Sequence, residues 1–430
     1  MLKAGFARTD VTPPLGTPIS GYFLERHAKG VLDPLYANAV AVSNEKETVL
    51  LIAADLIGIR RPYAERIGRL IAERTGVPTG NIFLSALHQH TAYTLNDDNA
   101  YNLNDPAFLD VLLRKLTDLA EMAIADQSEA TVGAAAEELK TPIGFVRRYF
   151  AEDGSIHTNP FSSVKITARV DEADNTVRVV RFFRPRAADI AILNFSTHPD
   201  VISGEKLSAD WPGLARTRME QALGDVHCLF FTGTQGDSNH IDYLKPQGER
   251  FVGDGRYDHA RYMARCVADT ACALWEGIVP SQDDTLYADS RVIYNRTNTE
   301  GIEDYDKYRA YYDDYEAGKI KNAHITDLAY ASRIIKLRKA PIFLPVPLTV
   351  VGVGGVVFVG FGGEAFTAYG AAARALAPDK FVLCSVCTNG YEGYFPTEKA
   401  FREGGYEPKS SLFTPTLERE ILSELADMIQ

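Results

Sequence analysis

The chain has 430 residues, of which 46% are hydrophobic and 24% are charged, so it is long enough to bury a large core. Its formal net charge is −12, and no basic tract interrupts this acidic balance, so nucleic acid is not an expected partner. Proline and glycine break the most apolar stretch, which leaves no uncharged run of about 18 residues to span a membrane. The N-terminal residues lack the apolar core of a signal peptide, and we therefore expect a cytoplasmic protein.

Strands and helices alternate along the first part of the chain. Apolar or alternating segments predict strands at ANAVAVS (37–43), TVLLIAADLIG (48–58) and NIFLSAL (81–87), and helical spacing predicts helices over 63–74 and 107–126. A β-rich middle follows, with VKITARV (164–170) and TVRVVRFF (176–183). The intervening DEADNT predicts a hairpin turn between these two strands.

The second half continues in the same manner. It predicts strands at DIAILNF (189–195), VHCLFFT (226–232), twice within 341–363 and at KFVLCSV (380–386), and helices near 212–223, 257–275 and 367–377. The charged, tyrosine-rich segment 296–340 is helical in period, and we interpret it either as a lid over a site or as a solvated helical hairpin. The pattern predicts an α/β fold, with a mixed β-sheet core flanked by helices in one domain over residues 1–430.

Two histidines at the end of an apolar segment are the first functional signal. LSALHQHTAY places His88 and His90 one residue apart. If this stretch is still extended, both imidazoles face the same side and point to one place. Such a pair suits a metal, or a metal ligand beside a proton-transfer group; two structural histidines at a strand end are an equally weighted alternative.

Polar side chains follow other predicted strands in the same way. His198 follows a strand in LNFSTHPD, Glu364 follows another in VVFVGFGGEAF, and Tyr391 and Tyr394 follow a third in LCSVCTNGYEGY. Ligands of open α/β sheets bind beyond the carboxyl ends of strands, so these groups are expected to form one site. Two imidazoles and a carboxylate are a common catalytic zinc set that leaves a position open for water.

The loop GTQGDSNH (233–240) follows a further strand and holds Asp237 and Ser238 in a tight glycine turn. This turn presents either a hydroxyl or a carboxylate to the site, or only local hydrogen bonds. It does not match the nucleophile elbow of α/β-hydrolases.

The order of these motifs resembles the catalytic domain of the neutral, non-lysosomal ceramidase family. AGFARTDVTPPLG resembles the start of that family, ALHQHTA its Thr-His-Thr-His-Ser segment, FGGEAFTAYG its Pro-Gly-Glu block, and TQGDSNH, imperfectly, its Gly-Asp-Val-Ser-Pro-Asn block. NGYEGYFPTEKAFREGGYE resembles its Asn-x-Tyr-x-x-Tyr-x-x-Thr block, with a further tyrosine twelve residues on. The resemblance runs in order over nearly the whole chain.

The resemblance implies a set of roles. It implies that one zinc ion per chain is bound by His88, His198, Glu364 and Tyr394. It implies that His90 is a proton-transfer or hydrogen-bonding group and that Asp237 and Ser238 lie in the catalytic loop. It also implies that Tyr406 and one arginine of GFVRRYF, for which we take Arg147, hold an oxyanion. The implied reaction is hydrolysis of the amide bond of an N-acyl lipid by zinc-activated water.

The sequence also departs from the family pattern. The block that contains Ser238 is one residue shorter, and the Ser-Gly-Pro after the histidines is missing. The chain stops soon after the tyrosine block, so we expect the fold of the family's catalytic domain without its C-terminal β-sandwich. We therefore expect a small-molecule substrate that is smaller or more polar than ceramide. An ester, lactone or glycoside hydrolase on the same zinc site, and a zinc-binding protein without turnover, are the alternatives. A homo-oligomer is left open.

Overall fold

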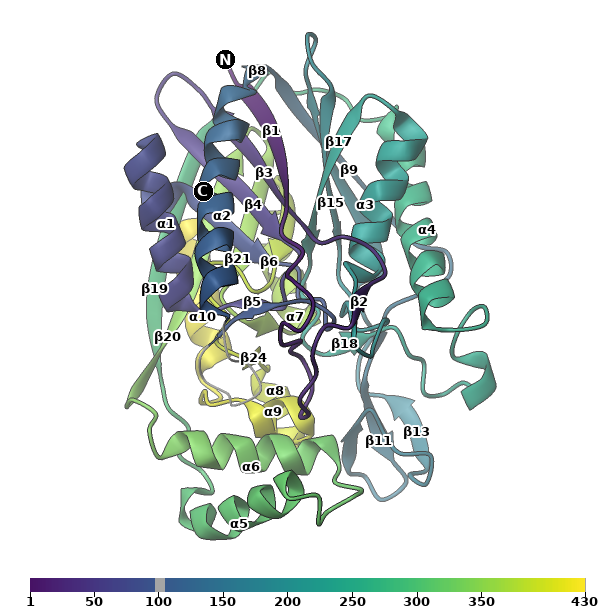
Figure 1. Cartoon of the computed structure of the whole chain (residues 1–430). Coiled ribbons are helices and arrows are strands. Elements are labelled where there is room, and N and C mark those ends of the chain that lie inside the picture. Colours follow the sequence, from purple (N-terminus) through teal and green to yellow (C-terminus); the bar gives the residue numbers. More distant parts are fainter. Residues whose placement is uncertain (97–104, 430) are drawn as a thin grey trace.

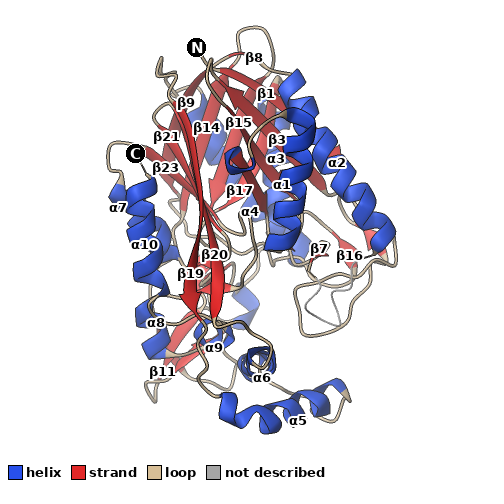
Figure 2. Ribbon diagram, turned by 90° about the vertical axis from the view of Figure 1, so that its left-hand side faces the viewer, coloured by secondary structure: helices blue, strands red, loops and turns tan. Residues whose placement is uncertain are grey.

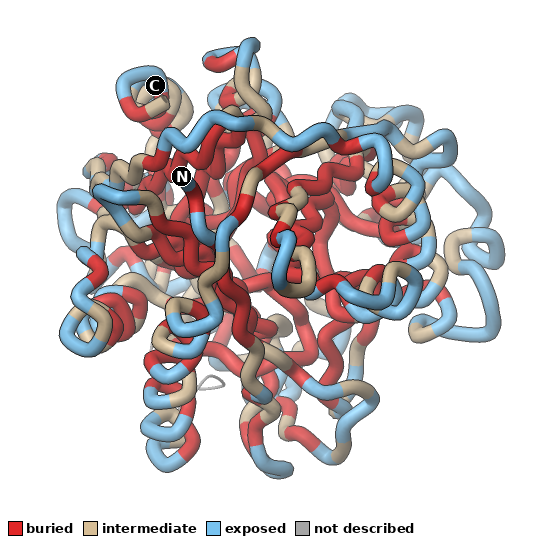
Figure 3. The backbone as a smooth tube through the Cα atoms, turned by 90° about the horizontal axis from the view of Figure 1, so that it is seen from above, coloured by how far each residue is buried: buried red, intermediate tan, exposed pale blue. Residues whose placement is uncertain are grey.

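The computed structural model describes residues 1–96 and 105–429, and its helices enclose β-structure from two sides (Figure 1). Helices α1 (Arg61–Thr75) and α2 (Pro106–Ala125) lie on one side, and α3 (Asp210–Leu223) and α4 (Arg256–Trp275) lie on the other. Figure 3 shows the buried segments at the centre and most exposed segments in the outer helices and loops.

The first sheet has the strand order β6-β4-β3-β1-β8. It consists of β1 (Lys3–Asp10), β3 (Tyr36–Ser43), β4 (Thr48–Ala54), β6 (Ile82–Ala86) and β8 (Ser128–Glu129), and β4 and β6 are parallel. Alternate residues of β3 enter different cores: Ala39 and Ala41 pack in the core that contains α1 and α2, and Val40 and Val42 pack toward the second sheet. Both faces of this sheet are therefore covered, which explains why its strands are almost continuously apolar.

The second sheet has the order β17-β15-β14-β9. Its strands are β9 (Thr131–Glu138), β14 (Thr176–Phe183), β15 (Asp189–Phe195) and β17 (Val226–Thr232), and β15 and β17 are parallel. The predicted hairpin at DEADNT is wrong. β13 (Ile166–Arg169) is largely exposed and joins β11 (Arg148–Ala151) and β12 (Ile156–Thr158) in a small separate sheet. β14 is mostly buried and pairs with β9 and β15 instead, because only the central sheet covers its apolar residues.

The third sheet has the order β19-β20-β21-β23. It consists of β19 (Leu286–Arg296), β20 (Phe343–Val353), β21 (Val356–Phe361) and β23 (Phe381–Ser385), and β21 and β23 are parallel. Helices α7 (Thr367–Leu376) and α10 (Leu417–Met428) lie beside it (Figure 2). β19 and β20 extend beyond the body of the sheet toward the end of the molecule where α5 and α6 lie (Figure 2).

The three sheets meet at the carboxyl ends of their parallel strand pairs. Asn194 of β15 donates to the backbone oxygens of Phe231 at 2.8 Å and of Cys384 at 2.9 Å, which joins the second sheet to the third. The Thr232 hydroxyl donates to the Leu87 oxygen at 2.8 Å, which joins the second sheet to the first. Loops that leave these strand ends are therefore brought to one place.

The segment 296–340 contains α5 (Tyr305–Glu316) and α6 (Ile325–Leu337), which lie at the lower end of the molecule next to α9 (Tyr406–Ser410) in Figure 1. Arg333 of α6 donates to the Ser411 oxygen at 2.8 Å, and Tyr315 of α5 donates to the Phe23 oxygen at 2.8 Å. The segment thus contacts two loops that reach the candidate site, and its role as a lid stays a prediction.

Short elements complete the described chain: β2 (Gly30–Val31), β5 (Gly58–Ile59), β7 (Thr94–Leu95), β10 (Phe145–Val146), β16 (Lys206–Leu207), β18 (Ser238–Asn239), β22 (Glu364–Ala365), β24 (Tyr394–Phe395), α8 (Glu398–Glu403), η1 (Thr79–Asn81), η2 (Gln247–Glu249) and η3 (Ile302–Asp304). No helix in the described part of the chain combines enough length with enough apolar residues to traverse a lipid bilayer.

Candidate metal centre and active site

The two histidines of the HQH segment converge, although the chain around them is not extended. β6 ends at Ala86, and His88 has a left-handed backbone with φ of 72°. Backbone hydrogen bonds fix this turn: His88 N–H donates to the Leu56 oxygen at 2.8 Å, and His90 N–H donates to the Pro199 oxygen at 3.1 Å. The Nε2 atoms of His88 and His90 lie 3.4 Å apart. The imidazoles therefore meet because of a strained turn held by neighbouring loops, and not because of strand alternation.

His198 and Glu364 complete the cluster. The Oε2 atom of Glu364 lies 3.2 Å from Nε2 of His88 and 3.2 Å from Nε2 of His198. The potential ligand nitrogens of His88, His90 and His198 lie within 4.8 Å of one another. His88, His198 and Glu364 are almost completely buried. Loops from three strand ends thus place three imidazoles and one carboxylate around a single point.

Outer contacts hold the ligand atoms in place. Nδ1 of His88 lies 2.7 Å from the Ile57 oxygen, and Nδ1 of His198 lies 3.1 Å from the Gln235 oxygen. Since each Nδ1 faces a carbonyl, each Nδ1 would carry the hydrogen when a metal is bound, and the Nε2 lone pair would be free to bind that metal. His198 Nε2 and Glu364 Oε2 have no partner in hydrogen-bond geometry among the described residues. Buried polar atoms without such partners fit a metal cation, whose ligands they would be.

Burial and neighbouring charges shift the pKa values of the three histidines in different directions. Burial, aided by the positive charge of Arg147, lowers the pKa of His198 to about 3, and burial together with His88 lowers the pKa of His90 well below its usual value. Burial also opposes protonation of His88, but Glu364 and Cys387 together outweigh it, and the pKa of His88 is raised well above its usual value. A divalent cation would supply the positive charge that the proton of His88 supplies to Glu364.

Tyr394 faces the same cluster. It lies opposite Glu364 on the parallel strands β22 and β24, so the two side chains leave the same face of this small ladder. Arg147 Nη2 donates to the Tyr394 hydroxyl at 3.0 Å, and the ring of Tyr406 packs on that of Tyr394 with centroids 5.5 Å apart. Arg148, the neighbour of Arg147, instead donates to the Gly404 oxygen at 2.7 Å. The structure therefore brings Arg147, Tyr394 and Tyr406 together beside Glu364.

Asp237 and Ser238 have local partners. One carboxylate oxygen of Asp237 accepts from both the backbone N–H and the hydroxyl of Thr367 at 2.8 Å, and so supports the start of α7. The Ser238 hydroxyl donates to the Ser196 oxygen at 3.2 Å. These contacts tie the 233–240 loop to the loops that carry Glu364 and His198. A direct catalytic role of Asp237 and Ser238 stays a prediction.

Other buried polar residues support the cluster. The hydroxyl of Tyr391 donates to Oε1 of Glu364 at 3.0 Å and orients Oε2 toward the histidines. Glu407 is fully buried and accepts from Nε of Arg147 at 2.8 Å. The sequence pointed to Tyr391 because it follows a strand end, but no sequence pattern distinguished Glu407. Asp210 accepts from the backbone N–H groups of residues 201 and 202, and burial raises its pKa to about 7.

The fold has counterparts among solved structures. No protein-family model matches the sequence, and no curated protein matches it significantly. The crystal structure of neutral ceramidase from Pseudomonas aeruginosa matches with a TM-score of 0.73 and 18% identity, over 99% of this chain and 74% of that chain. A structure described as ceramidase complexed with C2 matches with a TM-score of 0.74 and 17% identity, over the same shares. The chain has a ceramidase-like fold. The predicted α/β class, with a mixed β-sheet core flanked by helices, is confirmed, and part of the neutral ceramidase chain has no counterpart in this match.

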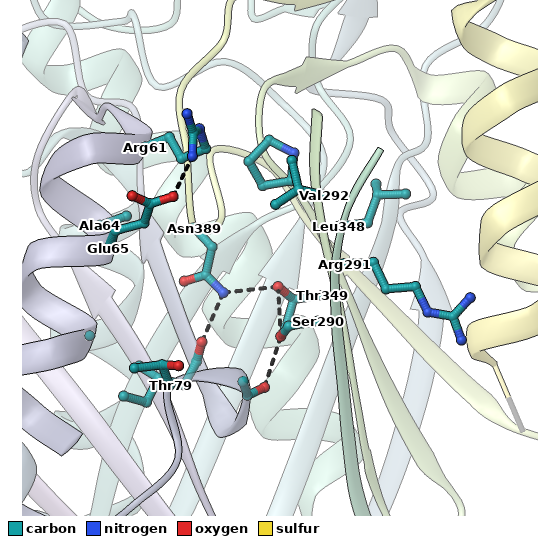
Figure 4. A pocket seen from close by; sticks show the side chains of 14 residues that line it. Arg61, Ala64, Glu65, Thr79, Ser290, Arg291, Val292, Leu348, Thr349 and Asn389 are labelled. Carbon is teal, nitrogen blue, oxygen red and sulfur yellow. Dashed lines mark hydrogen bonds and ion pairs between the residues drawn. The ribbon is translucent and has the colours of Figure 1, made fainter. Parts of the chain in front are cut away.

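A pocket of about 230 Å³ in this ceramidase-like fold lies apart from the cluster, between α1 and the strands β19 and β20 (Figure 4). Asn389 reaches toward Thr349 at its wall, and Arg61 is paired with Glu65. None of the candidate metal ligands lines this pocket. The convergent histidines and Glu364 are therefore the better candidate for the active site.

Proposed function

We propose that the protein is a zinc-dependent hydrolase that cleaves an N-acyl amide smaller or more polar than ceramide. The observation that carries this proposal is the contact of Glu364 Oε2 with the Nε2 atoms of both His88 and His198, each at 3.2 Å. The ceramidase-like fold supports the amide as the bond that is cleaved. Amide hydrolysis needs an activated water and stabilisation of the oxyanion that forms, and the cluster offers groups for both.

The donor set favours zinc. Two neutral imidazoles and a carboxylate are typical ligands of catalytic zinc, and Tyr394, whose oxygen accepts from Arg147, is the proposed fourth. When bound there, zinc lowers the pKa of water and polarises a carbonyl group. His90 is an alternative ligand, because its Nε2 lies 3.4 Å from that of His88. The ceramidase resemblance assigns it to proton transfer instead.

The remaining residues of the site transfer the proton and stabilise the oxyanion. Nε2 of neutral His90 takes up the proton that the attacking water loses, and later gives it to the leaving nitrogen. Arg147 is held by Glu407 at 2.8 Å and by the Gly236 oxygen at 3.0 Å, so its guanidinium has a fixed position beside the hydroxyl of Tyr394. Arg147 and the hydroxyl of Tyr406 then stabilise the oxyanion by charge and hydrogen bonding.

The surroundings of His90 support a polar substrate. Asp200 lies 3.8 Å from its Nδ1, and Tyr22 packs against its ring with centroids 5.5 Å apart. The guanidinium of Arg26 lies over the ring of Tyr22 and donates to the His90 oxygen at 2.9 Å. A substrate that approaches from this side meets charged and hydroxyl groups, which bind hydroxyls or amines better than an acyl chain.

The proposal is tested on protein stripped of metal and then reloaded with zinc. Release of free amine is measured from short N-acyl derivatives of hydroxylated amines, and long-chain N-acyl amides, esters and glycosides are assayed in parallel. We expect zinc-dependent cleavage of the short, polar amides and its loss in Glu364→Gln. His227→Ala, an exposed histidine at the start of β17, is the control and should keep full activity. Cleavage of an ester or glycoside and of no amide would refute the amidase assignment while keeping the metal site.

A further inference from the structure

Asp200 is a carboxylate in the candidate site to which the family resemblance assigns no role. It follows His198 by two residues, and its side chain is 27% exposed. Its Oδ1 atom lies 3.8 Å from Nδ1 of His90 and accepts a hydrogen bond from the hydroxyl of Tyr22. At 3.8 Å the contact with His90 is close but is not a hydrogen bond. A carboxylate oxygen has lone pairs for two donors, so the Tyr22 contact leaves one available for His90.

The backbone around Asp200 is fixed on both sides. Before it, the Pro199 oxygen accepts from His90 N–H at 3.1 Å, which ties this loop to the HQH turn. After it, the N–H groups of Val201 and Ile202 donate to the buried carboxylate of Asp210 at 3.0 Å and 2.9 Å. The Asp200 carboxylate is therefore held beside the imidazole of His90 by the same loop that carries His198.

The two ring nitrogens of His90 have different surroundings. Its Nε2 faces His88, and its Nδ1 is buried and has no hydrogen-bond partner among the described residues. A Cβ atom at Gly21 would lie 2.8 Å from this Nδ1, and φ at Gly21 is 111°. Glycine thus lets the loop that carries Tyr22 close over the Nδ1 side of the ring. Among the described residues, Asp200 is the carboxylate that pairs with this unpartnered nitrogen, at 3.8 Å.

We propose that Asp200 is a positioning residue for His90: its carboxylate accepts the hydrogen of His90 Nδ1 and keeps Nε2 unprotonated and directed toward the metal centre. This inference rests on the proposed function, in which Nε2 of His90 transfers the proton. When Nε2 takes up the proton of the attacking water, the carboxylate stabilises the imidazolium that forms, and the proton then leaves with the amine. Tyr22 holds the carboxylate in place from its other side.

The decisive experiment reads the tautomer of His90 directly. The zinc-loaded protein is labelled with ¹⁵N in its histidine rings, and two-bond proton–nitrogen correlations distinguish the Nδ1–H tautomer from the Nε2–H tautomer. The signals of His90 are assigned by their loss in His90→Gln. We expect the Nδ1–H tautomer in the wild-type protein and a loss of more than half of that population in Asp200→Asn. Asp242→Asn is the matched control, because Asp242 is partly buried nearby but pairs with Arg169 at 3.0 Å.

The outcomes separate this inference from the proposed function. Persistence of the Nδ1–H tautomer in Asp200→Asn, or an Nε2–H tautomer in the wild-type protein, would overturn the role of Asp200 even if amides are cleaved. A tautomer that depends on Asp200 supports that role even if no amide is cleaved. Asp200→Glu, which keeps the carboxylate, should restore part of the Nδ1–H population. With a cleaved substrate in hand, Asp200→Asn should lower kcat about 10-fold or more at unchanged zinc content.

Discussion

The buried ion pair between Asp55 and Arg216 offers a sharp test of how the HQH turn is supported. Asp55 follows β4, and both side chains are at most 2% exposed. The guanidinium donates to the two carboxylate oxygens at 2.8 Å and 3.2 Å. Asp55 also accepts from the side chain of Gln89, the residue between the two histidines, at 2.9 Å, and from Tyr36 N–H at 2.7 Å. The pair therefore joins helix α3 and the first sheet to the candidate metal centre.

The substitution Asp55→Asn keeps the shape of the side chain and removes its charge. The guanidinium of Arg216 is then buried without a counter-ion, and an amide N–H₂ replaces one of its acceptors. Loss of one partner of a buried pair costs about 3–5 kcal/mol. We expect the free energy of unfolding to fall by this amount. Zinc affinity should fall as well, because Gln89 loses its anchor.

A matched control lies on the same helix. Arg218 makes the same two-point contact with Asp269, at 2.6 Å and 3.0 Å, but the two side chains are 46% and 50% exposed. Asp269→Asn should therefore cost less than about 1 kcal/mol. Urea unfolding of both variants can be followed by the fluorescence of Trp211 and Trp275, in α3 and α4. Equal losses in the two variants would refute the reasoning that burial decides the effect.

Further predictions concern the site and its surroundings. Tyr391→Phe should weaken zinc binding about 10-fold in a competition with a chelator, because Glu364 loses the bond that orients it. Arg147→Lys should lower kcat/KM about 100-fold in the amidase assay. The single ammonium group of lysine cannot both donate to Tyr394 and stabilise an oxyanion. Burial lowers the pKa of His240 to about 3, so the unfolded chain binds a proton more readily than the folded one, and stability is lost as the pH falls below about 6.5. Between pH 7.5 and pH 5, the free energy of unfolding in urea should therefore fall by about 2 kcal/mol less in His240→Gln than in the wild-type protein. An identical pH dependence in the two proteins would contradict this prediction.

The location of the site could be predicted from the sequence because strand ends carry it. His88, His198, Glu364 and Tyr394 each follow a buried strand, and the parallel pairs β4–β6, β15–β17 and β21–β23 bring those ends together. Pairing of Glu364 with Tyr394 then sets two of the side chains on one face. Polar residues that come soon after apolar segments were the sequence evidence for this arrangement, and the assignment of the metal ligands stays a prediction.

Other features depend on contacts that the local sequence does not encode. The left-handed turn at His88 is held by oxygens of residues 56 and 199, which lie in loops distant in the chain from the turn. Glu407 is an ordinary glutamate in sequence, and only the fold buries it against Arg147. The prediction of a hairpin at DEADNT was wrong for a similar reason: local turn residues do not determine which strand can cover the apolar face of β14.

The most direct test of the central claim is the metal content of the purified protein. Zinc per chain is measured by elemental analysis in the wild-type protein, in His88→Ala and in His227→Ala, after purification without chelator and again after incubation with zinc. The account predicts about one zinc per chain in the wild-type protein and in His227→Ala, and a loss of that zinc in His88→Ala. A wild-type protein that holds no metal and takes up none on addition of zinc would contradict the metal centre and the hydrolytic mechanism with it.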